Sequence, residues 1–207
     1  MTHTNHRRGT REDLARDFVI LTMPARDINH EGARSKLQEF MRIASRHNPV
    51  NMGEGRQGSV HALGLDVLLD NMPDATACHA VFTDAGTVAA VLKDLADADL
   101  GMSVVVSGLF DVVDKCCQEA SIKRHTVEYS LGTWGRTEKL PSEAHLEITT
   151  MCGHGMIPAT LVDHLAAQVR QGRLTLEDAS LRMAKLCTCG IFNNARAADL
   201  LRAMAAP

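Results

Sequence analysis

The sequence has few aromatic residues and no long apolar run. Phe, Trp and Tyr make up 3% of the 207 residues, with a single Trp and a single Tyr. Proteins that bind single-stranded nucleic acid stack bases on several aromatic side chains, so this scarcity argues against that class. No stretch reaches the 18 apolar residues of a membrane span, and the polar residues 1–11 lack the apolar centre of a signal peptide. We therefore expect a cytoplasmic protein without membrane contact.

The chain also lacks an excess of positive charge. It carries 22 Lys and Arg against 25 Asp and Glu, a formal net charge of −3. A nucleic-acid-binding domain is expected to carry a basic surface, so we expect no nucleic-acid partner. Hydrophobic residues make up 45% of the chain. A chain of this length buries about 70% of its unfolded surface, so folding requires neither a metal nor a disulfide.

Short Val-rich segments alternate with segments of helical spacing. The predicted strands cover residues 17–22, 77–83, 103–107, 125–130 and 145–151. The predicted helices cover residues 31–47, 85–98, 108–122, 158–171, 175–186 and 193–204. This order predicts an α/β (α+β) fold: a β-α-β-α-β layer with at least one parallel strand pair, followed by a three-helix C-terminal cap.

The same pattern suggests how the chain is organised. Residues 1–16 are polar and are expected to form a mobile, solvated N-terminal arm. Residues 17–151 form the predicted α/β layer, and residues 152–207 form the helical cap that carries a cysteine site. No linker-like segment separates the last two parts, so we expect one continuous domain. A homodimer is possible on general grounds, since most soluble oligomers are symmetric dimers.

Six cysteines in a chain without an export signal indicate thiols, metal ligands or catalytic groups rather than disulfides. The strongest candidate is Cys152, which is followed by Gly153, His154 and Gly155. If a strand ends before it and a helix begins near Pro158, Cys152 lies at a sheet edge where ligands bind. The two glycines let a ligand approach the backbone closely, and His154 can act as acid, base or metal ligand. The alternative is a small buried cysteine beside an ordinary turn.

A second motif places Cys187, Cys189 and Gly190 just before the last predicted helix. If its loop meets the first one, Cys152, Cys187, Cys189 and His154 form a Cys₃His set suited to tetrahedral zinc. Three thiolates could equally hold an iron–sulfur cluster with one iron open to substrate. Gly190, like Gly153 and Gly155, is then expected to lie against the cofactor. The alternative is a pair of small residues packed in a tight turn.

The remaining cysteines and several other features have structural explanations. Cys116 and Cys117 fall on the apolar stripe of a predicted helix and are expected in the core. Cys78 is expected to be a structural residue of a strand. Residues 51–58, rich in glycine, are interpreted as a flexible connection, and Arg196 as part of a solvated helix face.

Residues 151–157 (Met-Cys-Gly-His-Gly-Met-Ile) resemble the catalytic motif of the proline racemase and hydroxyproline epimerase family. The resemblance covers seven residues. It implies that Cys152 exchanges the α-proton of an amino acid and that the Gly-His-Gly turn holds the substrate carboxylate. The family's second motif, an Asp-rich segment leading into Cys-Gly-Thr-Gly, has its nearest counterpart at Cys189 and Gly190, and this sequence departs from it after Gly190.

The sequence thus predicts an enzyme that depends on a metal ion or iron–sulfur cluster. The centre would act as a Lewis acid on a small, carboxylate-bearing substrate, with His154 as proton donor or acceptor, in a lyase or hydrolase reaction. Two alternatives remain open. One is a metal-free isomerase or epimerase that uses Cys152. The other is a non-catalytic protein that binds zinc or another metal.

Overall fold

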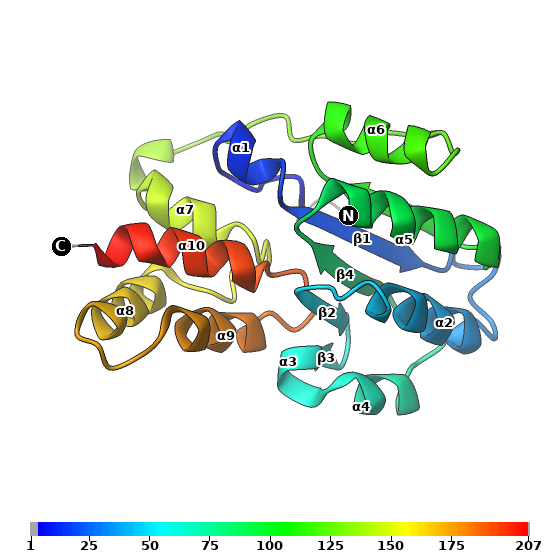
Figure 1. Ribbon diagram of the computed structural model, residues 1–207, viewed down its shortest axis with the longest axis horizontal. Helices are drawn as coiled ribbons and strands as arrows, with labels where there is room; N and C mark the ends of the chain where they lie inside the picture. The colour runs from blue at the N-terminus through cyan, green and yellow to red at the C-terminus, as the bar shows by residue number, and fades with distance from the viewer. Residues whose placement is uncertain (1–3, 207) are drawn as a thin grey trace.

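The computed structural model describes residues 4–206 and has the α+β fold that the sequence predicts (Figure 1). Its sheet has five strands in the order β3-β2-β4-β1-β5. The strands are β1 (Phe18–Met23), β2 (Asn51–Glu54), β3 (Gly58–Ser59), β4 (Cys78–Phe82) and β5 (Ser103–Ser107). The predicted strands at 17–22, 77–83 and 103–107 are therefore confirmed. Residues 1–3 of the expected arm and residue 207 lie outside the described residues.

The sheet corrects the predicted parallel pair, because all neighbouring strands are antiparallel. β4 and β5 do run in the same direction, but β1 lies between them. This is the split β-α-β connectivity of ferredoxin-like folds, with β3 added at one edge. The physical reason is the apolar character of β1, whose first five residues are all buried. Such a strand is covered on both faces and takes a central place in the sheet.

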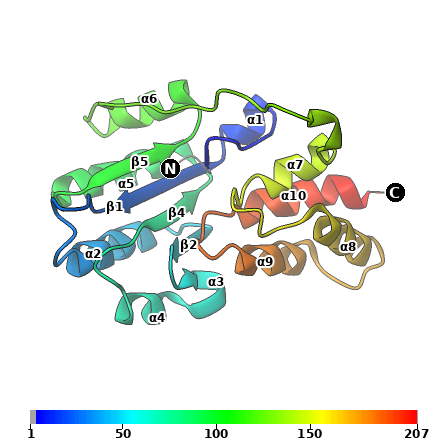
Figure 2. The same cartoon turned by 180° about the vertical axis from the view of Figure 1, so that it is seen from behind.

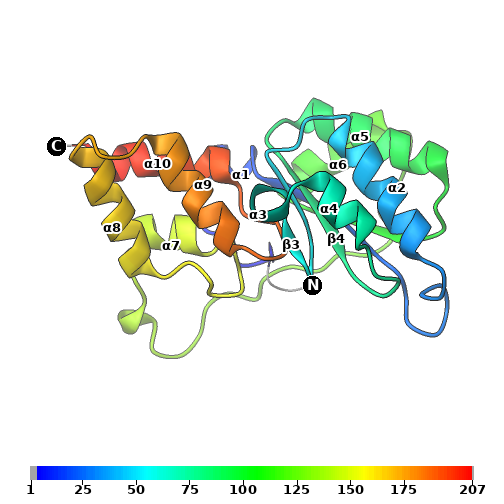
Figure 3. The ribbon, with the colours of Figure 1, turned by 90° about the horizontal axis from the view of Figure 1, so that it is seen from below.

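Helices cover one face of this sheet and form the first core. They are α2 (Arg34–Ser45) and α5 (Ala85–Ala98), with α6 (Phe110–Glu119) packed on α5 (Figure 3). The sequence predicts all three. Cys78, Cys116 and Cys117 are buried in this core, as expected. The expected flexible connection at 51–58 instead contains β2 and the first residue of β3, and β3 leads into the short helices α3 (Val60–Leu63) and α4 (Leu65–Asp70).

The C-terminal part is a bundle of helices beside the sheet (Figure 3). Its members are α7 (Glu143–Thr149), α8 (Ala159–Arg170), α9 (Leu176–Leu186) and α10 (Asn194–Ala205). The last three confirm the predicted cap helices, but the predicted strand at 145–151 is wrong. Its β-branched residues favour a strand locally, yet the segment folds as α7 because it buries Leu146 and Ile148 while packing on α8 and α10.

The predicted strand at 125–130 is also wrong. After α6 the chain passes over α1 (Arg11–Leu14) to α7 as an irregular segment (Figure 2). Within the described chain, no backbone–backbone hydrogen bond involves residues 123–134. Val127 and Tyr129 are more than half exposed, so the alternation that predicts a strand has no core to face. A 3-10 turn, Thr137–Lys139, follows. None of the helices among residues 4–206 is long and apolar enough to cross a membrane.

Candidate metal centre

The two cysteine loops meet in the core of the C-terminal bundle. Cys152 follows α7, Cys187 caps the end of α9, and Cys189 lies in the turn before α10. The Sγ atoms of Cys187 and Cys189 are 3.8 Å apart, and Cys189 Sγ is 3.6 Å from His154 Nδ1. The Cys152 thiol donates a hydrogen bond to Cys187. The four predicted ligands therefore form one continuous chain of contacts.

The surroundings of Cys152 differ from the expected ones. Because residues 145–151 contribute to a helix, Cys152 follows α7 and does not lie at the carboxyl end of a strand. Pro158 does precede α8, as its N-cap residue. The expected binding site at a sheet edge is therefore replaced by a site between two helices and the turn after α9.

The spacing of the donors matches the edges of a tetrahedral zinc site. With Zn–S bonds of about 2.3 Å and Zn–N bonds of about 2.0–2.1 Å, two sulfurs stand about 3.8 Å apart and a sulfur and a nitrogen about 3.6 Å. Both observed separations agree with these edges. Yet no three His, Cys, Asp or Glu side chains of the described residues converge as the ligands of one ion would. The types of donor atom and the two separations fit zinc, but the four side chains contact one another in a row and do not surround one point.

Burial and hydrogen bonding shift the pKa values of the three thiols in different directions. The bond that Cys152 donates to Cys187, together with burial, raises the pKa of Cys152 well above its ordinary value. For Cys187, the bond with Cys152 lowers the pKa. The bond between Cys187 and Cys189 and the burial of Cys187 have the opposite and larger effect, and together they raise its pKa to about 11. The bond between Cys189 and Cys187, together with one from the Ile191 backbone N–H, lowers the pKa of Cys189. Of the three thiols, Cys189, beside His154, therefore loses its proton most readily.

Two glycines hold the Cys189 turn against the sheet. A Cβ on Gly190 would lie 2.3 Å from the carbonyl carbon of Met52, and one on Gly53 would lie 2.7 Å from that of Cys189. The close approach that we expected Gly190 to make with a cofactor is thus made with β2. Gly153 and Gly155 differ, because both are exposed, and a Cβ on Gly155 would meet nothing within 4 Å. They leave the His154 turn open to solvent.

A buried charge network lies beside the centre, and the sequence reasoning missed it. The Asp17 carboxylate is fully buried and pairs with the guanidinium groups of Arg7 and Arg196. Arg196 Nη1 lies 2.9 Å from Asp17 Oδ2, and Asn193 Nδ2 donates to Asp17 Oδ1 at 3.0 Å. The expectation of a solvated Arg196 is therefore wrong, because its charge is satisfied inside the fold. No periodicity or motif marks these residues in the sequence.

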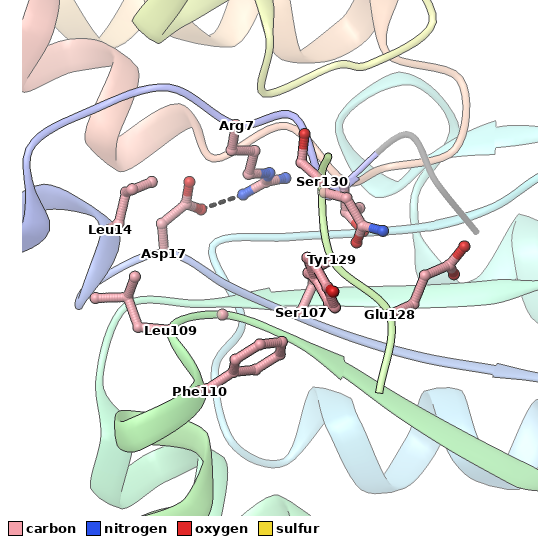
Figure 4. A pocket seen from close by; sticks show the side chains of 12 residues that line it. Arg7, Leu14, Asp17, Ser107, Leu109, Phe110, Glu128, Tyr129 and Ser130 are labelled. Carbon is pink, nitrogen blue, oxygen red and sulfur yellow. Dashed lines mark hydrogen bonds and ion pairs between the residues drawn. The ribbon is translucent and has the colours of Figure 1, made fainter. Parts of the chain in front are cut away.

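Arg7 connects this network to both cysteine loops. Its Nη2 donates to the carbonyl oxygens of Met151, at 3.2 Å, and of Ile191, while its Nη1 pairs with Asp17 (Figure 4). The Arg7 side chain is 5% exposed. The Arg7 side chain is therefore held inside the fold, and residues 11–14 form α1, so the expected mobile, solvated arm is corrected at these positions.

Two cavities lie near the sheet but away from the cysteines. One, of about 230 Å³, lies beside Arg7 and Asp17 and is also lined by Phe110 and Tyr129 (Figure 4). The other, of about 560 Å³, lies beyond β5 and is lined by apolar side chains such as Leu92 and Met102. None of the four predicted ligands lines either cavity.

The chain matches no protein-family model, no curated protein and no solved structure.

Proposed function

We propose that Cys152, Cys187, Cys189 and His154 bind a single soft divalent metal ion, and that this ion is zinc. The observation that carries the proposal is the pair of separations, 3.8 Å and 3.6 Å, which match two edges of a tetrahedral zinc site. In a [4Fe–4S] cluster held by three cysteines, each cysteine binds a different iron, so the cysteine sulfurs stand farther apart than along an edge of one tetrahedron. The 3.8 Å separation therefore favours a single ion over a cluster.

The exposure of the four residues supports a division of roles. The three cysteines are almost fully buried and would hold the ion, whereas His154 is exposed. A bound zinc ion supplies Lewis acidity. If a small, carboxylate-bearing substrate took the fourth coordination position from His154, the released imidazole would accept or donate the proton in a lyase or hydrolase reaction. The exposed glycines on either side of His154 keep the approach to this position free of side chains.

The proposal extends to location and partners. All six cysteines are free thiols, which suits a reducing compartment such as the cytoplasm. The partner proposed is a small molecule, and neither nucleic acid nor a membrane is invoked. The homodimer expected on general grounds stays a prediction.

Metal content of cysteine variants tests the proposal. The protein is produced in cells supplied with zinc and iron, purified without oxygen and analysed for metals and sulfide. We expect about one zinc per chain and loss of most of it from Cys152→Ala, Cys187→Ala and Cys189→Ala. Cys116→Ala is the matched control, because it removes a buried thiol of the other core and should retain zinc. Equal metal content in all four variants, or no metal in any of them, would refute the site. Iron with a matching amount of sulfide would show that the site holds an iron–sulfur cluster and not zinc.

A second candidate is metal-free thiol chemistry, and the lowered pKa of Cys189 favours it. A thiolate next to an imidazole is an activated nucleophile or base. The resemblance to the racemase family assigns this role to Cys152, but burial and the bond to Cys187 raise the pKa of that thiol. Under this candidate, iodoacetamide should alkylate Cys189 faster than Cys152 in the metal-free protein. Faster alkylation of Cys152 would instead support the role that the resemblance implies.

A further inference from the structure

The Arg7 guanidinium joins the two loops that carry the cysteines. Among residues 4–206, no backbone–backbone hydrogen bond joins residues 150–158 to residues 187–193. Arg7 binds a carbonyl oxygen of each loop, that of Met151 and that of Ile191. One lies directly before Cys152 and the other two residues after Cys189. The loops also touch through His154 and Cys189 and through Cys152 and Cys187, and Arg7 adds a side chain that binds the backbone of both.

Buried polar contacts surround the Arg7 bridge and restrict its orientation. A guanidinium presents several N–H groups in one plane, so it can bond two carbonyls and a carboxylate together. Asp17 balances its charge, and Arg196 and Asn193 fix the orientation of that carboxylate. The side of the Cys189 turn that faces away from Arg7 packs against β2 through Gly190. The turn is thus held between the sheet and Arg7.

We propose that Arg7 is a positioning residue of the cysteine centre: by setting the separation of the two loops, it determines how long the centre retains its metal. This inference rests on the proposed zinc site. Groups that orient metal ligands without touching the metal commonly change metal affinity by about 10–100-fold when they are removed. The N-terminal segment, remote in sequence from all four ligands, would then be part of the centre.

Two substitutions separate positioning from simple loss of structure. Arg7→Met removes every donor, whereas Arg7→Lys keeps a charge beside Asp17 but lacks the planar fork that spans both carbonyls. Arg11→Met is the matched control, because Arg11 belongs to the same segment and pairs with Asp111 at the exposed surface. Circular dichroism and urea unfolding identify any variant that fails to fold, and Arg7→Lys, with its ion pair retained, is expected to fold.

The first readout is metal retention. Zinc transfer to a chromogenic chelator should be about tenfold faster in Arg7→Met, intermediate in Arg7→Lys and unchanged in Arg11→Met. The absorption spectrum of the cobalt-substituted protein should also change in both Arg7 variants, because it reports the ligand geometry directly. Folded Arg7 variants with the transfer rate and cobalt spectrum of the parent protein would overturn the inference.

The second readout does not depend on metal. In the metal-free protein, alkylation of Cys152 and Cys189, located by mass spectrometry, should be faster in both Arg7 variants than in Arg11→Met. If the parent protein takes up no metal but this difference is found, the zinc proposal fails while the positioning role stands. If the parent protein binds zinc and neither alkylation nor zinc transfer differs, the positioning role fails while the zinc proposal stands.

Discussion

At the scale of single residues, the thiols of the centre differ in how readily they lose a proton. Metal ligands must be thiolates, but burial and hydrogen bonding keep Cys152 and Cys187 protonated at neutral pH. Zinc binding should therefore release protons, and zinc affinity should rise with pH, since fewer protons must be displaced. Calorimetric titration in two buffers of different ionisation enthalpy measures this release. An affinity independent of pH would contradict thiolate ligation, and Cys116→Ala should behave as the parent protein does.

A second residue-scale prediction concerns the Asp17 network. Asp17→Ala leaves the buried Arg7 and Arg196 guanidinium groups without their shared carboxylate. An uncompensated buried charge typically costs about 3–5 kcal/mol, so the free energy of unfolding in urea should fall by about that amount. Asp111→Ala also breaks an ion pair, but at the exposed surface, and should leave the unfolding curve unchanged. Equal effects of the two substitutions would show that the network adds no stability of its own.

The residues of the centre differ in how far the sequence reveals them. Cys152, Cys187 and Cys189 lie in short motifs with glycine, and this local signal was enough to select them together with His154. Arg7 carries no such signal, because an arginine in a polar segment resembles a solvated side chain. Its role depends on a contact with Ile191, 184 positions away in the sequence. Contacts of this range are set by the tertiary fold, which a local pattern does not encode.

At the scale of elements, the contact between β2 and the Cys189 turn depends on two glycines. In Gly190→Ala the new Cβ would collide with the Met52 backbone, and φ of +70° is unfavourable for alanine. Strain and overpacking together should cost about 2–5 kcal/mol. Gly155→Ala has almost the same φ but free space around the Cβ, so it should cost about 1–2 kcal/mol. Urea unfolding measures both, and equal costs would mean that the backbone contact is unimportant.

The elements that were predicted wrongly share one cause. Residues 145–151 and 125–130 both carry strand-forming side chains over fewer than eight residues. The first segment becomes helical because α8 and α10 offer a surface for Leu146 and Ile148. The second remains irregular because, among the described residues, it makes no backbone–backbone hydrogen bond with a neighbouring strand. The longer helices are predicted more closely, since their period repeats over several turns: α5 has the predicted ends, and the ends of α8, α9 and α10 lie within one residue of the prediction.

At the scale of the whole molecule, the sheet contributes to both cores. Neighbouring residues of a strand point to opposite faces, so β1 buries Ile20 in the first core and Val19 in the second. β4 does the same with Ala80 and Val81. The order of helices and strands along the sequence predicts an α+β protein, but it does not predict which strands lie between the two cores. That position follows from strand order, which only the complete packing determines.

Because the cores share β1 and β4, the two parts of the molecule should unfold together. Calorimetry should give a single transition for the metal-free protein, with equal calorimetric and van't Hoff enthalpies. Zinc bound in the second core should then raise the free energy of unfolding of the whole molecule by about 2.7 kcal/mol at a zinc concentration 100 times the Kd. Each kcal/mol corresponds to a rise of about 2–4 °C in Tm. Cys187→Ala should keep the single transition but lose the zinc shift. Two transitions, with zinc moving one alone, would mean that the bundle folds independently of the sheet and that the shared strands do not couple the cores.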